Sequence, residues 1–163
     1  MLSVAPVLTN ARHEDGKLRA HEIQILANIA QAKFQEALQH SAPILGELGI
    51  NVSNTDPAAI QSELVKTLAL LDSSDITGQT VIQSILSKPT SIDSWQIGHM
   101  RILCYSARAA YGAKPTLMLF IILRMVQKVV SDNEITAESS YAFANLSFAL
   151  SGLGIHNVSF LAS

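Results

Sequence analysis

Residues 95–130 read WQIGHMRILCYSARAAYGAKPTLMLFIILRMVQKVV and contain the longest apolar run of the chain, Leu117–Leu123. Glycine and proline interrupt this stretch at Tyr111–Pro115, so it divides into two segments. Both segments are apolar around most of a helical circumference, which is typical of helices in a protein interior. The sequence therefore predicts a central buried helical hairpin made of residues 94–111 and 116–131.

The sequence on either side of this hairpin predicts helices that are apolar on one face only. Within residues 17–39, Ile23, Leu26, Ala30 and Phe34 recur every three or four residues, which favours a single amphipathic helix. Capping residues, prolines and glycines predict further helices over residues 41–49, 57–72, 81–88 and 136–152. No stretch shows the sustained alternation of a half-buried strand. We expect an all-α fold, a single globular domain of six to seven helices in which amphipathic helices surround the hairpin.

The two ends of the chain differ from this helical domain, which we place at residues 17–154. Pro6 and a polar, turn-like stretch predict an N-terminal arm over residues 1–16. Gly152 and Gly154 end the last helix, so residues 155–163 form a C-terminal tail. We expect both arms to be flexible, and their apolar residues offer a neighbouring molecule a segment to clasp.

The composition limits the classes of function. Of the 163 residues, 48% are apolar and only 15% are charged, so packing against partners is favoured over binding through charge. The net charge of −2 argues against a protein that neutralises many phosphates. Cys104 is the only cysteine, which excludes a disulfide within the chain and a metal site built from several thiolates. We expect no metal and no cofactor.

The sequence also favours a cytoplasmic protein, or one held within an assembled particle. The first residues lack the basic region of a secretory signal, and Glu14 and Asp15 disfavour a transit peptide. The apolar part of residues 117–130 is shorter than a membrane span and carries Arg124 and Lys128, so we expect no membrane-spanning segment.

One side of the segment 94–111 carries a narrow basic stripe. Arg101 and Arg108 lie nearly in line on a helix, with Tyr105 between them. Guanidinium groups bind phosphates and a tyrosine ring stacks on bases, so this stripe is a candidate contact for nucleic acid or another anion. Further cations that extend it are Lys114, Arg124 and Lys128. The alternative is that these cations pair with acidic residues of neighbouring helices.

The opposite side of the same segment predicts an apolar pocket with one polar group. Trp95, His99, Leu103 and Ser106 share this side. The alternative for His99 is a hydrogen bond within the core. Cys104 is interpreted as a small core residue, and no catalytic motif accompanies it, so we do not expect an enzyme.

Two hypotheses about function follow. The first is a non-catalytic helical subunit of the coat, shell or nucleocapsid type, which associates with copies of itself or with another protein and contacts nucleic acid through the basic stripe. The second is a helical regulatory domain that binds a small apolar ligand beside Trp95 and His99.

Overall fold

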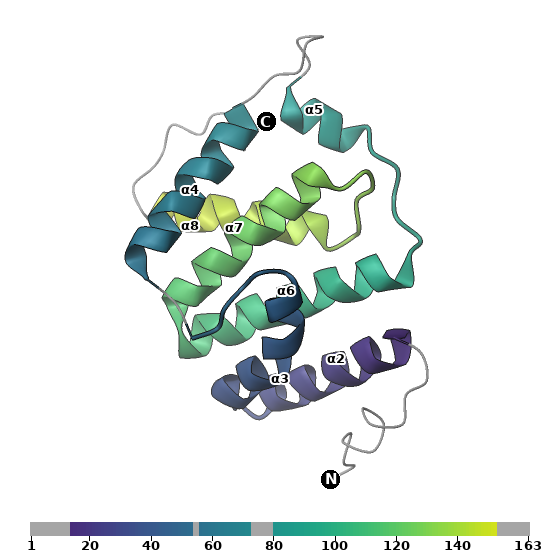
Figure 1. Cartoon of the computed structure of the whole chain (residues 1–163), viewed down its shortest axis with the longest axis vertical. Coiled ribbons are helices and arrows are strands. Elements are labelled where there is room, and N and C mark those ends of the chain that lie inside the picture. Colours follow the sequence, from purple (N-terminus) through teal and green to yellow (C-terminus); the bar gives the residue numbers. More distant parts are fainter. Residues whose placement is uncertain (1–13, 54–55, 73–79, 153–163) are drawn as a thin grey trace.

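The computed structural model describes residues 14–53, 56–72 and 80–152, and these residues form seven α-helices without a β-strand (Figure 1). In chain order the helices are α2 (Glu14–Ala30), α3 (Phe34–Glu47), α4 (Pro57–Asp72), α5 (Val81–Leu86), α6 (Ser94–Ala113), α7 (Pro115–Ser131) and α8 (Ser139–Gly152). The predicted all-α fold is confirmed.

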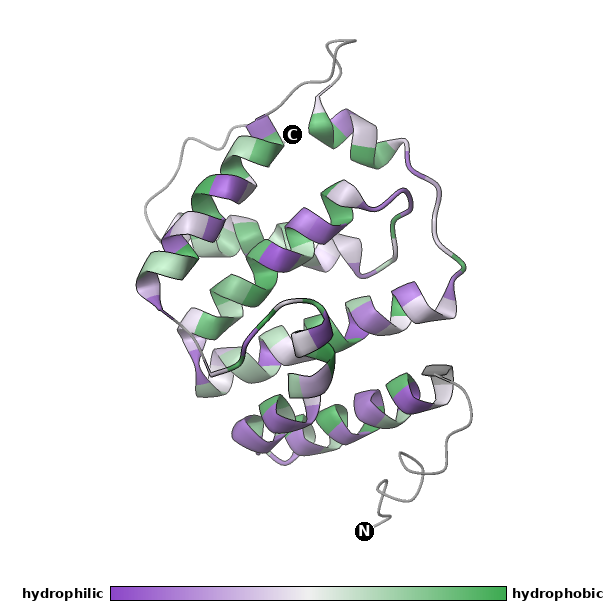
Figure 2. Ribbon diagram, in the orientation of Figure 1, coloured by the Kyte–Doolittle hydropathy of each residue, from purple (hydrophilic) through white to green (hydrophobic). Residues whose placement is uncertain are grey.

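Helices α6 and α7 lie at the centre, as the hairpin prediction required. Only Lys114 separates them, because Pro115 lacks the N–H that would continue α6 and begins the next helix instead. Helices α2 and α3 pack on α6, whereas α4 and α8 pack on α7 (Figure 1). Figure 2 shows α7 hydrophobic along most of its length, and α2 with alternating hydrophobic and hydrophilic residues. The central pair is therefore the hydrophobic axis of the molecule.

The prediction of one helix over residues 17–39 was wrong. Helix α2 ends at Ala30 and α3 begins at Phe34, with Ala32 between them in the left-handed conformation (φ 56°). The N–H of Lys33 donates to the carbonyl of Asn28, and that of Ala32 to the carbonyl of Ile29, which together form a Schellman C-cap. Glycine usually occupies the left-handed position of this cap, so alanine there gave no stop signal.

Several further boundaries differ from the predictions: α6 ends at Ala113 and not at residue 111, and α5 ends at Leu86 and not at residue 88. Helix α2 begins at Glu14, so residues 14–16 belong to a helix and not to the N-terminal arm. Pro43 lies inside α3 and does not begin a separate helix, although Gly49 (φ 71°) follows the end of α3 as predicted. The expected helix at 136–152 begins at Ser139. The rest of the N-terminal arm and the tail at 155–163 lie outside the described residues.

The segment that leads into α6 is tied to the loop between α7 and α8. The N–H of Ser91 donates to the carbonyl of Ile135 (2.7 Å), and the N–H of Ile135 donates to the carbonyl of Pro89 (2.9 Å). The ammonium group of Lys88 donates to three carbonyls at the end of α7, those of Val129, Val130 and Asp132. These bonds hold the first turn of α6 beside the last turn of α7.

Candidate functional site

The first two turns of α6 carry an aromatic pair, in which Trp95 is at the surface and His99 is buried. Asp93 caps the helix, because its carboxylate accepts from the N–H of Trp95 (3.0 Å). The rings of Trp95 and His99 meet edge to face with centroids 4.3 Å apart. The Nδ1 atom of His99 lies 2.9 Å from the carbonyl oxygen of Trp95, and its Nε2 lies 3.6 Å from a carboxylate oxygen of Glu47. Packing and hydrogen bonding therefore fix both rings.

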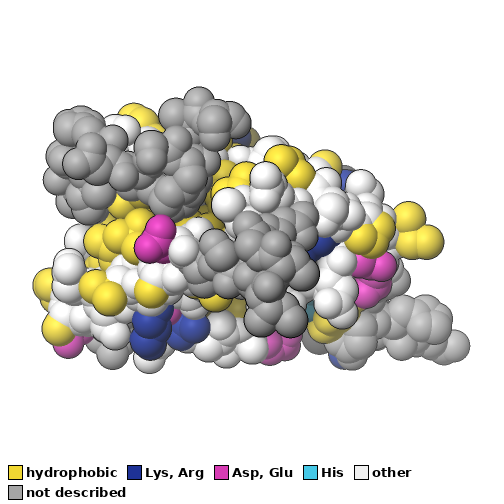
Figure 3. Space-filling model, turned by 90° about the horizontal axis from the view of Figure 1, so that it is seen from above, with side chains coloured by type: hydrophobic (Ala, Val, Ile, Leu, Met, Phe, Trp, Pro, Cys, Tyr) yellow, Lys and Arg dark blue, Asp and Glu magenta, His cyan; other side chains and the backbone are white. Residues whose placement is uncertain are grey.

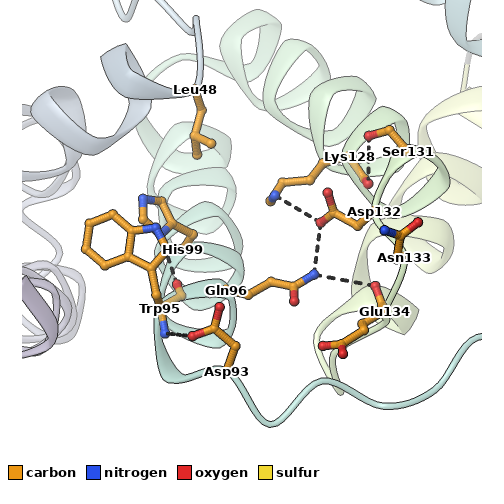
Figure 4. A pocket seen from close by; sticks show the side chains of 10 residues that line it. All are labelled: Leu48, Asp93, Trp95, Gln96, His99, Lys128, Ser131, Asp132, Asn133 and Glu134. Carbon is orange, nitrogen blue, oxygen red and sulfur yellow. Dashed lines mark hydrogen bonds and ion pairs between the residues drawn. The ribbon is translucent and has the colours of Figure 1, made fainter.

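A cavity of about 530 Å³ lies between this pair and the end of α7 (Figure 4). On its far side Asp132 accepts hydrogen bonds from the side chains of Gln96 (3.0 Å) and Lys128 (2.9 Å). Three carboxylates, those of Asp93, Asp132 and Glu134, line this cavity together with the single cation Lys128. We call it the acidic cavity.

A second cavity of about 470 Å³ adjoins the first. Leu48, Lys128 and Ser131 line both cavities, so the two form one trough. No carboxylate lines the second cavity, whose charged lining residues are Lys66, Arg124 and Lys128. We call it the basic cavity.

A buried carboxylate anchors one wall of the basic cavity. Glu63 of α4 is buried and accepts hydrogen bonds from Lys66 (3.0 Å) and from Gln127 of α7 (2.9 Å). Arg124 lies 3.6 Å from the same carboxylate and stacks over the ring of Phe120 (5.5 Å). Burial opposes ionisation of Glu63, but these hydrogen bonds and the charges of Arg124 and Lys66 outweigh it and lower the pKa of Glu63.

Four of the five cations predicted to contact nucleic acid already have partners. Arg101 donates to Glu138 (2.9 Å), and this hydrogen bond raises the pKa of Arg101. Lys114 donates to the backbone carbonyl of residue 52 (3.1 Å), while Arg124 and Lys128 lie near carboxylates in the trough. Arg108 is exposed, and the described residues give it no ion pair.

The third member of the predicted stripe, Tyr105, is partly buried. Burial, together with the charge of Glu22, raises the pKa of the Tyr105 hydroxyl. Arg101, Tyr105 and Arg108 belong to α6, whereas Arg124 and Lys128 line the trough. Lys114 is the single residue between α6 and α7. The predicted set is thus distributed over separate parts of the molecule.

The predicted ligand pocket divides in the same way. Trp95 and His99 line the acidic cavity, and Leu103 lines the basic cavity. Ser106 is fully buried and donates to the carbonyl of Ile102 (2.6 Å), so it lines neither. Sequence reasoning missed Gln96 and Asp132, because the contact between them joins residues 36 positions apart and has no local signal.

Helix α8 presents a face of a different kind. Its sequence, SSYAFANLSFALSG, contains no charged residue. Ser139, Ala142, Leu146 and Leu150 are buried, and among the described elements α8 contacts only α7 and α6. On the opposite side Ser140, Ala144, Phe148 and Ser151 are exposed, and Phe148 is 65% exposed. In the view of Figure 3, hydrophobic side chains are spread over the described surface, with few charged side chains among them.

Two further features concern Cys104 and the residue types that bind metal ions. Cys104 is buried, and burial raises the pKa of its thiol to about 12. No group of three or more histidine, cysteine, aspartate or glutamate side chains is placed to bind a metal ion within residues 14–53, 56–72 and 80–152.

No protein family, curated protein or solved structure matches this chain. Across the described residues, no helix combines the length and the apolar character that crossing a lipid bilayer requires.

Proposed function

We propose that this protein is a non-catalytic helical building block that associates with a second copy of itself through the outer face of α8. The observation that supports it most is the exposed Phe148 on a helix without a charged residue. A surface helix normally carries charged or polar residues on its outer side, whereas α8 exposes Ala144 and Phe148 there among its serines. A partner on α8 would bury that face.

The pattern of side chains on this face suits a second copy. Ala144 and Phe148 lie four residues apart on this face, in one row with Tyr141, which is partly buried against the core. The small side chain of Ala144 leaves room between the two rings, into which Phe148 of a second copy would fit. An uncharged face meets its own copy without like-charge repulsion, as a two-fold symmetric interface requires.

The proposal does not extend to nucleic acid. Arg101, Lys114 and Lys128 are hydrogen-bonded or ion-paired within the chain, and the predicted cations are distributed over separate parts of the molecule, so they do not form one surface for a phosphate backbone.

Sedimentation velocity of the full chain tests the proposal. We expect a dimer at micromolar to submillimolar concentration, and we expect Phe148→Glu to shift the protein to monomer, because it places two carboxylates opposite one another at the interface. Leu86→Glu is the matched control, since Leu86 is 76% exposed on α5, away from α8, and should leave the dimer unchanged.

Two outcomes would overturn the proposal. One is a monomer at every concentration of the unchanged protein. The other is a dimer that survives Phe148→Glu while circular dichroism shows the helices intact, because the interface would then lie elsewhere.

A further inference from the structure

The basic cavity has the features of a binding site that self-association through α8 does not use. We propose that it binds a small organic anion with an apolar body, of the medium-chain carboxylate class. The inference is independent of the proposed dimer, because the cavity is lined by residues of α4, α6 and α7 and by the segment that follows α3, whereas none comes from α8.

The charges around the cavity favour an anion. Lys66, Arg124 and Lys128 line it, and the carboxylates that pair with them belong to Glu63 and Asp132. Three cations thus share two carboxylates, neither of which lines the cavity. The surplus positive charge faces the cavity, where partial exclusion of water strengthens its attraction for an anion.

Arg124 also has hydrogen-bonding capacity that the chain leaves unused. Its Nε atom is buried and lacks a hydrogen-bond acceptor in the described structure. The nearest carboxylate oxygen, on Glu63, lies 3.6 Å away and that oxygen already accepts from Gln127. A buried donor without an acceptor costs about 1–3 kcal/mol, so an oxygen atom supplied by a ligand would relieve a real penalty.

The negative end of α7 would oppose an anion at this position, because the last carbonyls of a helix carry a partial negative charge. Lys88 offsets it. Its ammonium group donates to the carbonyls of Val129, Val130 and Asp132 at distances of 2.6–2.9 Å.

The remaining wall explains why the ligand should have an apolar body. The lining residues of the cavity also include four apolar ones, Leu48, Ile50, Leu70 and Leu103. The volume of about 470 Å³ falls within the range of pockets that hold small organic ligands. An alkyl chain packed on these apolar residues, with its carboxylate toward Arg124, contacts both the apolar and the cationic lining residues. A bare inorganic anion contacts only the cations.

Isothermal titration calorimetry of the full chain with octanoate, 1-octanol and acetate tests the proposal. We expect octanoate to bind saturably at one site, and we expect octanol, which lacks the charge, and acetate, which lacks the chain, to bind roughly tenfold more weakly or not at all. Arg124→Gln should weaken octanoate binding about tenfold. Arg108→Gln, which removes an exposed arginine outside the trough, should not change it.

Leu70→Trp provides a test that keeps every charge in place. The larger side chain fills the cavity, so octanoate binding should be lost while the thermal unfolding midpoint stays close to that of the unchanged protein. The proposal fails if octanoate does not bind, if octanol binds as tightly as octanoate, or if Leu70→Trp, still folded, binds octanoate unchanged.

Discussion

The ammonium group of Lys88 takes the place of a C-terminal cap on α7. It donates to three carbonyls that have no partner within the helix. Lys88→Met keeps most of the apolar stem but removes these donors, so we expect the free energy of unfolding to fall by about 2 kcal/mol. Urea unfolding followed by circular dichroism measures this loss.

Lys33→Met is the control for that prediction. Lys33 is exposed in the turn between α2 and α3, where only its backbone contributes to the cap, so its replacement should change stability by less than about 0.5 kcal/mol. Equal losses in the two variants would show that the hydrogen bonds of Lys88 contribute nothing.

The thiol of Cys104 should resist alkylation. Burial raises its pKa to about 12, so almost no thiolate forms near neutral pH, and the side chain is shielded from reagent. We expect iodoacetamide at pH 8 to modify the folded protein at least roughly tenfold more slowly than the urea-unfolded chain. Mass spectrometry of timed samples measures both rates. Faster modification of the folded chain would instead indicate an activated nucleophile and would contradict the expectation that the protein is not an enzyme.

Sequence reasoning at the level of single residues succeeded where a position has a local cause. The predicted start of the hairpin at residue 94 agrees with the cap that Asp93 forms on α6, because an aspartate before a helix accepts a hydrogen bond from a following backbone N–H. The pairing of Arg101 with Glu138 and of Gln96 with Asp132 depends on how distant helices meet, and no spacing in the sequence encodes it. The sequence therefore predicted that these cations could pair with acidic residues of neighbouring helices, but not which residues they pair with.

At the scale of helices, the close approach of α3 to α6 depends on Gly112. A Cβ atom added at Gly112 would lie 2.5–2.8 Å from ring atoms of Phe34, the first residue of α3. Gly112→Ala should therefore destabilise the protein by about 1–3 kcal/mol, although alanine is the better helix former. Thermal and urea unfolding measure the loss.

Gly46→Ala is the matched control, because it replaces another helical glycine and is expected to raise stability instead of lowering it. Gly46 lies within α3 with no atom near its missing side chain, so alanine should stabilise the protein by about 0.5–1 kcal/mol. In a protein that already carries Phe34→Ala, the further change Gly112→Ala should cost less stability than it costs in the unchanged protein, because the ring of Phe34 is then absent. Stabilisation by Gly112→Ala would show that the ring of Phe34 moves aside freely.

The helices themselves were predictable to the extent that their ends carry standard signals. Pro57 begins α4 and Pro115 begins α7 because proline suits the first turn, and the bounds of α4 agree with the prediction. The end of α2 was missed because Ala32 adopts a conformation that alanine rarely occupies, stabilised by the two hydrogen bonds of the cap.

For the whole molecule, the apolar pattern predicted which helices lie at the centre but not which hollows remain between them. The distribution of apolar residues around a helix predicts whether the helix is buried, and the sequences of α6 and α7 contain that information. A cavity arises where side chains of four elements fail to meet, and the basic cavity is an example. The predicted pocket was consequently divided between two cavities, and most of the charged residues that line them were not foreseen as neighbours.

Acid should weaken the contact between α4 and α7 through Glu63. Its pKa in the folded protein is lowered from the ordinary value of 4.5, so the carboxylate binds protons less readily in the folded chain than in the unfolded chain. Its stabilising contribution is therefore complete above the unfolded pKa and is lost as the pH falls through the lower folded value. Glu63→Gln removes that titration, and we expect it to cost about 1–3 kcal/mol at pH 7 and progressively less below about pH 4.

Urea unfolding of Glu63→Gln and of the unchanged protein, between neutral and acidic pH, measures how the difference between their free energies of unfolding decreases. Glu36→Gln is the control, because Glu36 is exposed in the first turn of α3 and should change stability little at any pH. A difference between Glu63→Gln and the unchanged protein that stays constant with pH would mean that packing of the side chain, and not its charge, joins α4 to α7. The same measurement tests whether the charge of Glu63 stabilises the wall of the basic cavity, since the ionised carboxylate of Glu63 pairs with Lys66 and Arg124.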